Sequence, residues 1–224
     1  KRFVADVDLG AGRPYLPECK APTGKKVAIV GAGPTGLSTA YYLLQDGHEC
    51  TVFDDHDKAG GMLRYGVKED DLPRGVLDLE VAIILTLGAR FKLNTTIGKD
   101  IPMADIMRRF DAVVLATGRL DAAKAAALGA EMNGPVIKID QTTFESAAKG
   151  VFAGGEAVHH GRLAVRAVGH GKAIACSVNQ FLSGAAVVGR RLPFNSAIGK
   201  VDGDELKEFL KDADRSPRVS PAGD

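Results

Sequence analysis

The sequence predicts an α/β fold built around a central parallel sheet. Three stretches carry this prediction, and each is a short apolar run that ends in a glycine-containing turn: 27–36, 111–118 and 150–157. After the first of these turns comes a helical stretch, and then a second β-rich run at 50–53. A strand, a glycine turn, a helix and another strand in this order are typical of the βαβ unit of a Rossmann-like domain.

The turn after the first strand has the glycine spacing of a dinucleotide-binding fingerprint. Gly31, Gly33 and Gly36 follow the pattern GxGxxG, with Pro34 and Thr35 between the last two glycines. The first glycine permits the tight turn, the second lets a pyrophosphate approach the backbone, and the third lets the helix lie close to the strand. The N–H groups and the positive dipole end of the helix then face the phosphates.

An acid at the end of the second strand extends this fingerprint. Asp54 follows at the distance of about 20 residues at which a carboxylate accepts hydrogen bonds from a ribose diol. Ala40 is small where the helix must pack closely, and Gly47 stands where a helix C-cap is expected. The alternative is an ordinary helix–strand turn without a ligand, and the added acid favours the dinucleotide site.

Composition and charge exclude several classes of protein. The chain has 224 residues, enough for one large domain or two small ones. A net charge of +1 gives no indication of binding to nucleic acid or to an anionic membrane, and the apolar runs are too short to span a bilayer. Cys19, Cys50 and Cys176 form no CxxC pair, so they predict no metal or dithiol centre and suit a reducing cytoplasm.

The remaining elements follow from periodicity and from the positions of proline and glycine. Residues 1–7 resemble the end of a helix, and 8–25 an extended lead-in rich in glycine and proline. Prolines suit the first turns of two predicted helices. The further helices are predicted at 73–87, 102–109, 163–182 and 204–211, with a short helix or linker at 119–133. The further strands are predicted at 89–93, 111–118 and 136–139, and at the start of 150–157.

Two more turns lie where an open α/β sheet binds ligands, at the carboxyl ends of strands. They contain Thr117–Gly118 and Gly155–Glu156. A glycine doublet, Gly60–Gly61, follows the ribose acid and suits a loop that passes close to phosphates, the alternative being a flexible surface loop.

These motifs together resemble the FAD domain of two-dinucleotide-binding flavoproteins, and in particular the glutamate synthase small-subunit-like oxidoreductases. The resemblance covers about residues 1–184 and is most specific at 60–67, 112–117 and 150–155. The opening residues look like the exit from that family's iron–sulfur domain. Because the sequence begins at Lys1 without Met, we expect a domain cut from a longer protein or a processed chain. The organisation that it implies is a lead-in at 1–24, an FAD-binding domain at 25–190, and a polar tail at 191–224, partly disordered or docked on a partner.

The resemblance implies a set of cofactor contacts. The FAD pyrophosphate would be held by Gly31, Gly33, Pro34, Thr35 and Gly36. The adenosine would be held at its ribose by Asp54 and at its adenine by Ile97. The phosphate and ribityl region would be lined by Gly61, Met62, Leu63 and Arg64, and closed by Thr117, Gly118, Gly155 and Glu156. The flavin N1/O2 edge would face the N–H groups of a helix that begins near Leu163 and Ala164.

The chain departs from the family pattern in three places. The family carries an NAD(P)H-binding domain after the Ala-Thr-Gly turn, but here the connection 119–150 is too short for one and has no second GxGxxG, so 119–133 takes its place. Glu156 stands where the family has aspartate, which lengthens or tilts the ribityl contact. Lys68 replaces a proline, which redirects the loop near the flavin and makes it more basic.

These features predict an FAD-dependent oxidoreductase domain or subunit that relays electrons between its flavin and a partner, with an iron–sulfur protein or domain as the expected partner. One alternative is a flavin reduced directly by NAD(P)H docked on an open face or on a partner chain. Others are a redox-silent structural module and a plain NAD-binding dehydrogenase domain, against which the Gly155–Glu156 turn counts. No side chain is predicted to be catalytic.

The charged residues near the expected flavin loops allow two interpretations each. His159 and His160 are solvated loop histidines or proton shuttles, and the former is favoured. Arg64 and Lys68 are exposed loop charges or guides for an anionic electron donor.

Overall fold

The chain divides into two units, Lys1–Arg191 and Leu192–Asp224. The computed structural model describes residues 2–12, 14–161, 163–191 and 203–212. In the second unit it describes the helix α8 (Gly203–Phe209), close to the helix expected at 204–211. The residues after 212, for which disorder or docking on a partner is expected, lie outside the described part of the chain.

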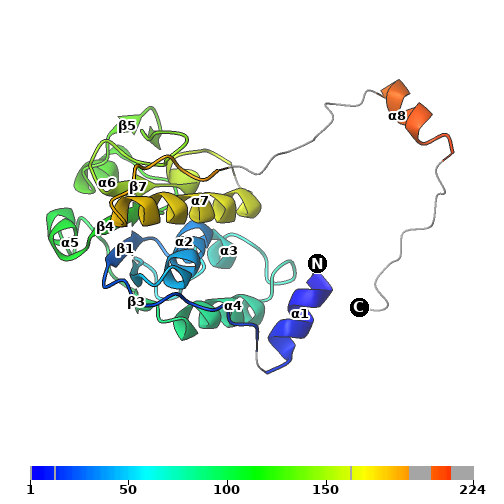
Figure 1. The fold of residues 1–224 in the computed structure, drawn as a ribbon, viewed down its shortest axis with the longest axis horizontal. Helices are drawn as coiled ribbons and strands as arrows, with labels where there is room; N and C mark the ends of the chain where they lie inside the picture. The colour runs from blue at the N-terminus through cyan, green and yellow to red at the C-terminus, as the bar shows by residue number, and fades with distance from the viewer. Residues whose placement is uncertain (1, 13, 162, 192–202, 213–224) are drawn as a thin grey trace. The chain divides into compact units, whose positions relative to one another are not determined.

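A five-stranded sheet in the order β3-β2-β1-β4-β7 forms the centre of the first unit (Figure 1). Its strands are β1 (Lys26–Val30), β2 (Glu49–Phe53), β3 (Arg90–Lys92), β4 (Ala112–Leu115) and β7 (Val151–Ala153). Every pairing within this sheet is parallel, which confirms the predicted Rossmann-like α/β fold. The chain crosses from the centre to one edge and then returns to the other side of β1, as a doubly wound sheet does.

The helices cover both faces of this sheet. The bounds of the larger ones are α2 (Pro34–Gln45), α4 (Arg74–Thr86), α5 (Met103–Arg109) and α7 (Ala164–Leu182). On one face, Val27 and Ile29 of β1 lie in a buried cluster with α2, α4 and α7 side chains. On the other face, Ala28 and Val30 lie in a second buried cluster, with Met103 and Ile106 of α5. Successive residues of β1 thus point to opposite faces and enter two buried clusters, which explains why residues 27–30 are all apolar.

The helices α2 and α7 pack closely against each other. A Cβ atom at Gly171 would lie 2.6 Å from Ser38 Cβ and 2.6 Å from the Thr35 carbonyl oxygen. The hydroxyl of Ser38 donates to the Val168 carbonyl oxygen at 2.9 Å. Glycine at position 171 therefore permits the close packing of α7 on α2. At Gly169, by contrast, a Cβ would meet none of the described atoms within 4 Å.

The connection between β4 and β7 forms a short helix and a hairpin. They are α6 (Ala122–Ala127), β5 (Met132–Asn133) and β6 (Val136–Ile137), and the two strands pair antiparallel. Ala125 and Ile137 are buried, and Ile137 belongs to the cluster on the α5 face. This connection thus contributes to the core on the α5 face of the sheet.

Two segments contain helix where the sequence predicts none. The first helix, α1 (Arg2–Gly10), extends beyond the expected 1–7 into the segment predicted to be an extended lead-in. The loop predicted after Asp54 contains one helical turn, α3 (Met62–Tyr65). A single turn of four residues is too short for a periodic pattern to reveal.

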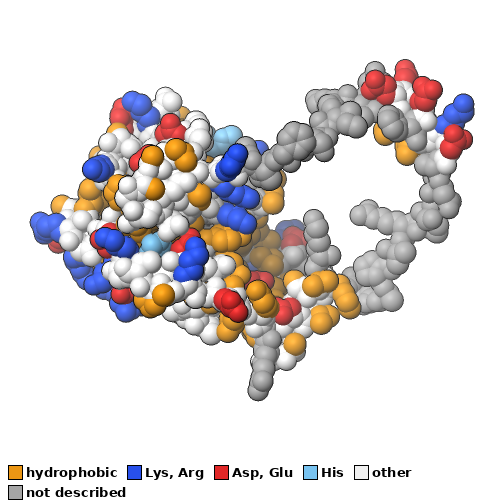
Figure 2. All heavy atoms as spheres, viewed as in Figure 1, with side chains coloured by type: hydrophobic (Ala, Val, Ile, Leu, Met, Phe, Trp, Pro, Cys, Tyr) orange, Lys and Arg blue, Asp and Glu red, His pale blue; other side chains and the backbone are white. Residues whose placement is uncertain are grey.

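The surface agrees with the balanced composition. Figure 2 shows basic and acidic side chains interspersed over the visible face, without a large area of one sign. Of the helices that the structure describes, none is both long and apolar enough to cross a membrane.

The cysteines are expected to differ strongly in their reaction with a thiol reagent. Cys50 is buried in β2, and this burial raises its pKa to about 12, whereas Cys19 is exposed. Because the thiolate is the reactive species, an aromatic disulfide at about pH 8 should label Cys19 in the native protein and Cys50 only after unfolding. Peptide mapping by mass spectrometry identifies the labelled residue, with Cys19→Ser as control. Rapid labelling of Cys50 in the native protein would contradict this assignment.

Candidate functional site

Three glycine turns meet at one edge of the sheet. In the parallel register, Val30 of β1 lies opposite Leu115 of β4, and Leu115 lies opposite Ala153 of β7. Two backbone hydrogen bonds then join the turns themselves: Ala116 N–H donates to the Val30 carbonyl at 2.8 Å, and Gly154 N–H donates to the Leu115 carbonyl at 3.0 Å. Turns distant in the sequence therefore share one edge, as the ligand hypothesis requires.

The fingerprint glycines have different structural reasons to be glycine. Gly31 has φ +110°, and a Cβ there would lie 2.2 Å from the Ala116 carbonyl oxygen. A Cβ at Gly36 would lie 1.9 Å from the carbonyl oxygen of Gly31. At Gly33 the nearest described atom to a Cβ would be Gly61 Cα, at 3.9 Å. The first and third glycines thus permit packing within the protein, whereas the second faces open space and needs another explanation.

The start of α2 offers backbone donors beside that open space. Gly33 is its N-cap residue, Pro34 occupies the first turn, and within the described part of the chain no side chain caps this end. The first intrahelical bond of this turn runs from Leu37 N–H to the Gly33 carbonyl at 2.9 Å. The N–H groups of Thr35 and Gly36 precede this bond, so they are available to an anionic group.

Asp54 is fixed by hydrogen bonds and retains acceptor capacity. Its side chain is 9% exposed, and its Oδ2 accepts from Ala32 N–H at 2.6 Å. Its Oδ1 accepts from His56 N–H and lies 2.9 Å from His56 Nδ1. A carboxylate has about four acceptor positions, so one on Oδ2 remains for a ribose hydroxyl. Burial lowers the pKa of His56, but the carboxylates of Asp54 and Asp55 outweigh this effect and raise it.

The ligand atoms of Asp54, Asp55 and His56 lie within 4.8 Å of one another, a spacing that a metal ion can occupy. The same atoms already bond to one another, and Asp54 also bonds to the fingerprint turn. This cluster is therefore explained without a metal ion.

The segment after Asp54 lies against the fingerprint turn. Gly60 N–H donates to the Ala32 carbonyl at 2.8 Å, and a Cβ at Gly61 would lie 2.7 Å from Gly33 Cα. Met62 is exposed, whereas Leu63 lines a groove beside α4. Of the predicted segment 61–64, Gly61 thus lies against the second fingerprint glycine, whereas Leu63 faces the groove beside α4.

Arg64 and Ile97 lie in surroundings that the sequence did not indicate. Arg64 is buried, its Nε donates to the Ala59 carbonyl at 2.6 Å, and its guanidinium pairs with Asp78 of α4. The interpretation of Arg64 as an exposed loop charge is therefore wrong. Lys68 is exposed. Ile97 is buried in the core cluster of the α5 face, so its side chain packs within the protein.

The turns after β4 and β7 differ in how closely their glycines are packed. Gly118 has φ +73°, and a Cβ there would meet none of the described atoms within 4 Å. A Cβ at Gly155 would lie 2.4 Å from the Thr35 hydroxyl oxygen, so this turn packs against the start of α2. Glu156 Oε2 lies 3.6 Å from Arg119 Nε, which joins the turn after β7 to the turn after β4. Leu163 is the exposed N-cap residue of α7, and Ala164 is its first residue.

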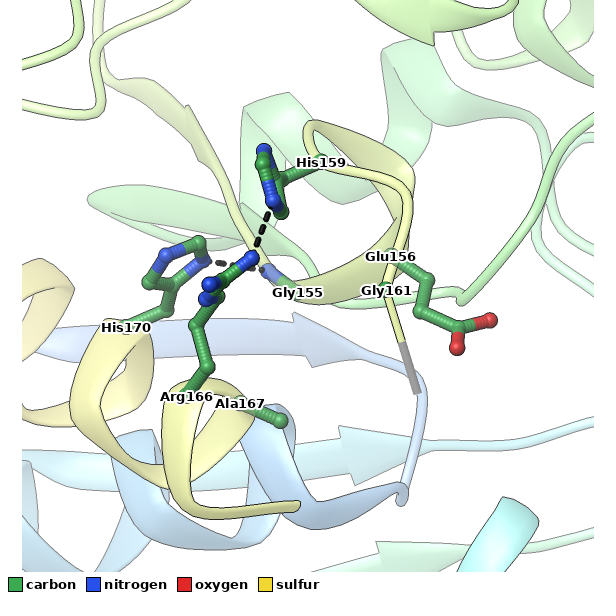
Figure 3. A pocket seen from close by; sticks show the side chains of 7 residues that line it. All are labelled: Gly155, Glu156, His159, Gly161, Arg166, Ala167 and His170. Carbon is green, nitrogen blue, oxygen red and sulfur yellow. Dashed lines mark hydrogen bonds between the residues drawn. The ribbon is translucent and has the colours of Figure 1, made fainter. Parts of the chain in front are cut away.

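A small pocket of about 10 Å³ lies beside the turn after β7 (Figure 3). Besides Gly155 and Glu156, it is lined by His159, Arg166 and His170. Gly155 N–H donates to Nδ1 of His170 at 3.2 Å. Burial lowers the pKa of His170, and the nearby His159 and Arg166 lower it further. Sequence reasoning missed Arg166 and His170, which reach this pocket only because α7 packs beside the turn after β7. It also missed Arg119, which meets Glu156 because β4 and β7 are neighbours.

A larger groove of about 540 Å³ lies along α1, α2 and α4. Its lining includes Tyr15, Tyr41 and Tyr42, together with the carboxylates of Asp8 and Glu80. Burial and the neighbouring Asp8 raise the pKa of Glu80. The groove contains neither the fingerprint glycines nor Asp54, but it reaches the start of α2 at Pro34 and includes Leu63, two of the predicted cofactor contacts.

Comparison with known proteins supports the relationship that the motifs indicate. Residues 29–94 match the NAD(P)-binding Rossmann-like domain family. The NADP(+)-dependent formate dehydrogenase subunit beta of Moorella thermoacetica is 41% identical over 53% of this chain and 20% of its own length. The glutamate synthase [NADPH] small chain of Bacillus subtilis is 42% identical over 53% of this chain and 24% of its own. The resemblance is thus confirmed for about half of the chain, and the matched region is about a fifth to a quarter of these relatives.

Solved structures show the same fold. A thioredoxin reductase from Gloeobacter violaceus matches with a TM-score of 0.53 and 13% identity, over 76% of this chain and 98% of the other. THI4 of Thermovibrio ammonificans matches with a TM-score of 0.50 and 18% identity, over 71% of this chain and 90% of the other. At these identities the likeness concerns the arrangement of strands and helices alone.

Proposed function

We propose that this chain is an FAD-binding oxidoreductase domain that relays electrons to or from a partner. About half of the chain is homologous to glutamate synthase small chains and related NADPH oxidoreductase subunits, which supports this proposal. The observation that carries the proposal is the convergence at one sheet edge of an uncapped helix start, a fixed carboxylate and two further turns. A long molecule with a pyrophosphate at its centre fits such a row of donors and acceptors.

The residues at this edge fit the parts of FAD in order. The pyrophosphate would lie over Gly33 against the N–H groups of Thr35 and Gly36, where a Cβ would otherwise fill the open space. Asp54 would accept from the adenosine ribose with its remaining acceptor position. Gly118 leaves room on the side of β4, and Gly155 and Glu156 would face the ribityl chain. Bound FAD supplies the redox chemistry, and the protein binds and orients it.

The partner is proposed from what the described chain contains. The connection from β4 to β7 holds only α6 and the β5–β6 hairpin among its helices and paired strands, and this leaves no room for a second nucleotide-binding sheet. We therefore propose that electrons reach or leave the flavin through another domain or chain, with an iron–sulfur partner as the leading candidate. The relatives are named as subunits, which supports a partner chain.

A second candidate is direct reduction of the flavin by NADPH docked on a partner chain or on an open face. Its support is that the names of several relatives include NADPH. Anaerobic stopped-flow mixing of the FAD-loaded chain separates the two candidates. Bleaching of the flavin by NADPH alone supports the second, whereas bleaching only in the presence of a reduced iron–sulfur protein supports the first. Reduction by dithionite without exchange with either would leave a structural role for the nucleotide.

The primary test is uptake of FAD by the purified chain. We expect one FAD per chain, with a shifted visible spectrum and quenched flavin fluorescence. Gly33→Ala provides a matched variant, because φ at this residue is −77° and a Cβ meets its nearest described atom at 3.9 Å. This variant should keep the circular dichroism spectrum and the unfolding midpoint but lose FAD. A wild-type chain that neither retains nor takes up FAD would refute the proposal.

A further inference from the structure

Three basic side chains surround the small pocket beside the turn after β7. His159 comes from the loop after that turn, and Arg166 and His170 come from α7 (Figure 3). The guanidinium of Arg166 bonds to Nε2 of His159, and Nδ1 of His170 accepts from Gly155 N–H. The cluster is held in place from two elements and therefore has a defined arrangement.

The hydrogen bonds settle which groups remain to face a ligand. Arginine is always a donor, so His159 accepts with Nε2 and carries its ring proton on Nδ1. His170 accepts with Nδ1, so its proton lies on Nε2. Each ring then retains one N–H donor, and Arg166 retains its other N–H groups. The remaining donors can bind an acceptor ligand, which would replace solvent at the exposed His159 and Arg166.

The electrostatics of the pocket point the same way. Glu156 lines it, but Figure 3 shows its carboxylate directed away from the three basic side chains, and it pairs with Arg119 at 3.6 Å. Burial is the largest cause that lowers the pKa of His170, and the neighbouring His159 and Arg166 lower it further. Arg166 contributes a permanent positive charge to the pocket. A volume of about 10 Å³ admits a single oxygen atom or water from the open side.

We propose that Arg166, His159 and His170 form an anion subsite that receives one oxygen of a phosphate or carboxylate group on the molecule that exchanges electrons with the flavin. The inference rests on the proposed function, since it places the subsite beside the Gly155 turn assigned to FAD. It narrows the class of the redox partner to one that presents an anionic group at this turn. Charge-assisted hydrogen bonds to arginine give such a subsite both affinity and orientation.

Titration of the FAD-loaded chain with inorganic phosphate and, separately, with acetate tests this proposal. Histidine ring resonances are followed by NMR at constant pH and ionic strength, with His48 and His56 as internal references. We expect saturable shifts of His159 and His170 and none of His48, whose ring nitrogens already contact Thr23 and Asn179. Saturation by phosphate identifies a phosphoryl-bearing partner, and saturation by acetate alone identifies a carboxylate-bearing one.

Substitutions of Arg166 test whether the anion binds at this pocket. Arg166→Gln should weaken the anion affinity by about tenfold or more, and Arg166→Lys should retain part of it. Arg90→Gln is the matched control, because Arg90 lies in the edge strand β3 and pairs with Glu49. Absence of saturable shifts with both anions, or equal affinity in wild type and Arg166→Gln, overturns the proposal.

Repeating the titration without flavin distinguishes failure of the anion subsite from failure of the proposed FAD-binding function. Shifts seen without FAD but lost when FAD is bound would assign the pocket to FAD itself and overturn the subsite. A chain that takes up no FAD refutes the proposed function, whereas the anion titration of the same sample still shows whether the pocket binds an anion.

Discussion

Gly36→Ala is expected to destabilise the protein by about 3 kcal/mol or more. The added Cβ would lie 1.9 Å from the carbonyl oxygen of Gly31, and that atom belongs to the backbone of a turn. Gly31 has φ +110° and packs against Ala116, so it has little freedom to retreat. Relief therefore requires α2 to move away from the sheet, with loss of packing in the core. Chemical denaturation followed by circular dichroism measures the change.

The control for this variant is Gly169→Ala in α7. A Cβ at Gly169 meets none of the described atoms within 4 Å, and the residue is helical. Alanine is the better helix former, so this variant should gain about 0.5–1 kcal/mol. Equal stability of Gly36→Ala and wild type would show that the approach of α2 to the first turn is looser than described.

Asp54→Ala is expected to weaken FAD binding by about tenfold to a hundredfold. The carboxylate is buried at the sheet edge where the glycine turns meet, and its remaining acceptor position is the one assigned to the adenosine ribose. Its removal also leaves Ala32 N–H without this acceptor, so the glycine turn loses part of its support. Titration of the flavin-free protein with FAD, followed by fluorescence quenching, gives the dissociation constant.

Two further variants separate ribose binding from support of the turn. Asp55→Ala removes an exposed neighbouring acid that contacts His56, and its FAD affinity should stay within about twofold of wild type. Asp54→Asn retains one acceptor oxygen for Ala32 N–H, so its stability should exceed that of Asp54→Ala while FAD binding stays weakened. Unchanged FAD affinity in Asp54→Ala would refute the ribose contact.

The elements that the sequence predicts well are those with local signals. β1, α2 and β2 follow from an apolar run, a glycine turn and a helical stripe within one short segment. Strand ends are less well predicted, because a strand extends only as far as its neighbour pairs with it. The stretch expected at 89–93 is thus shortened to Arg90–Lys92, where pairing with β2 stops.

The contacts that define the candidate site could not be predicted from local patterns. Arg64 follows a glycine doublet and looks like a loop charge, yet it is buried by pairing with Asp78 on α4. Glu156 meets Arg119 only because β4 and β7 are neighbours. Periodicity shows which face of an element is buried, but it contains no information on which distant polar groups will meet.

The intrinsic ultraviolet fluorescence of this chain comes from tyrosines in two separate places. The sequence contains four tyrosines and no tryptophan, and three of the tyrosines line the groove along α1, α2 and α4. The fourth, Tyr65, stacks on His56 beside Asp54, with ring centroids 4.5 Å apart. Tyr65→Phe therefore leaves emission from the groove alone, so events at that groove and events near the ribose acid can be recorded separately without an attached dye.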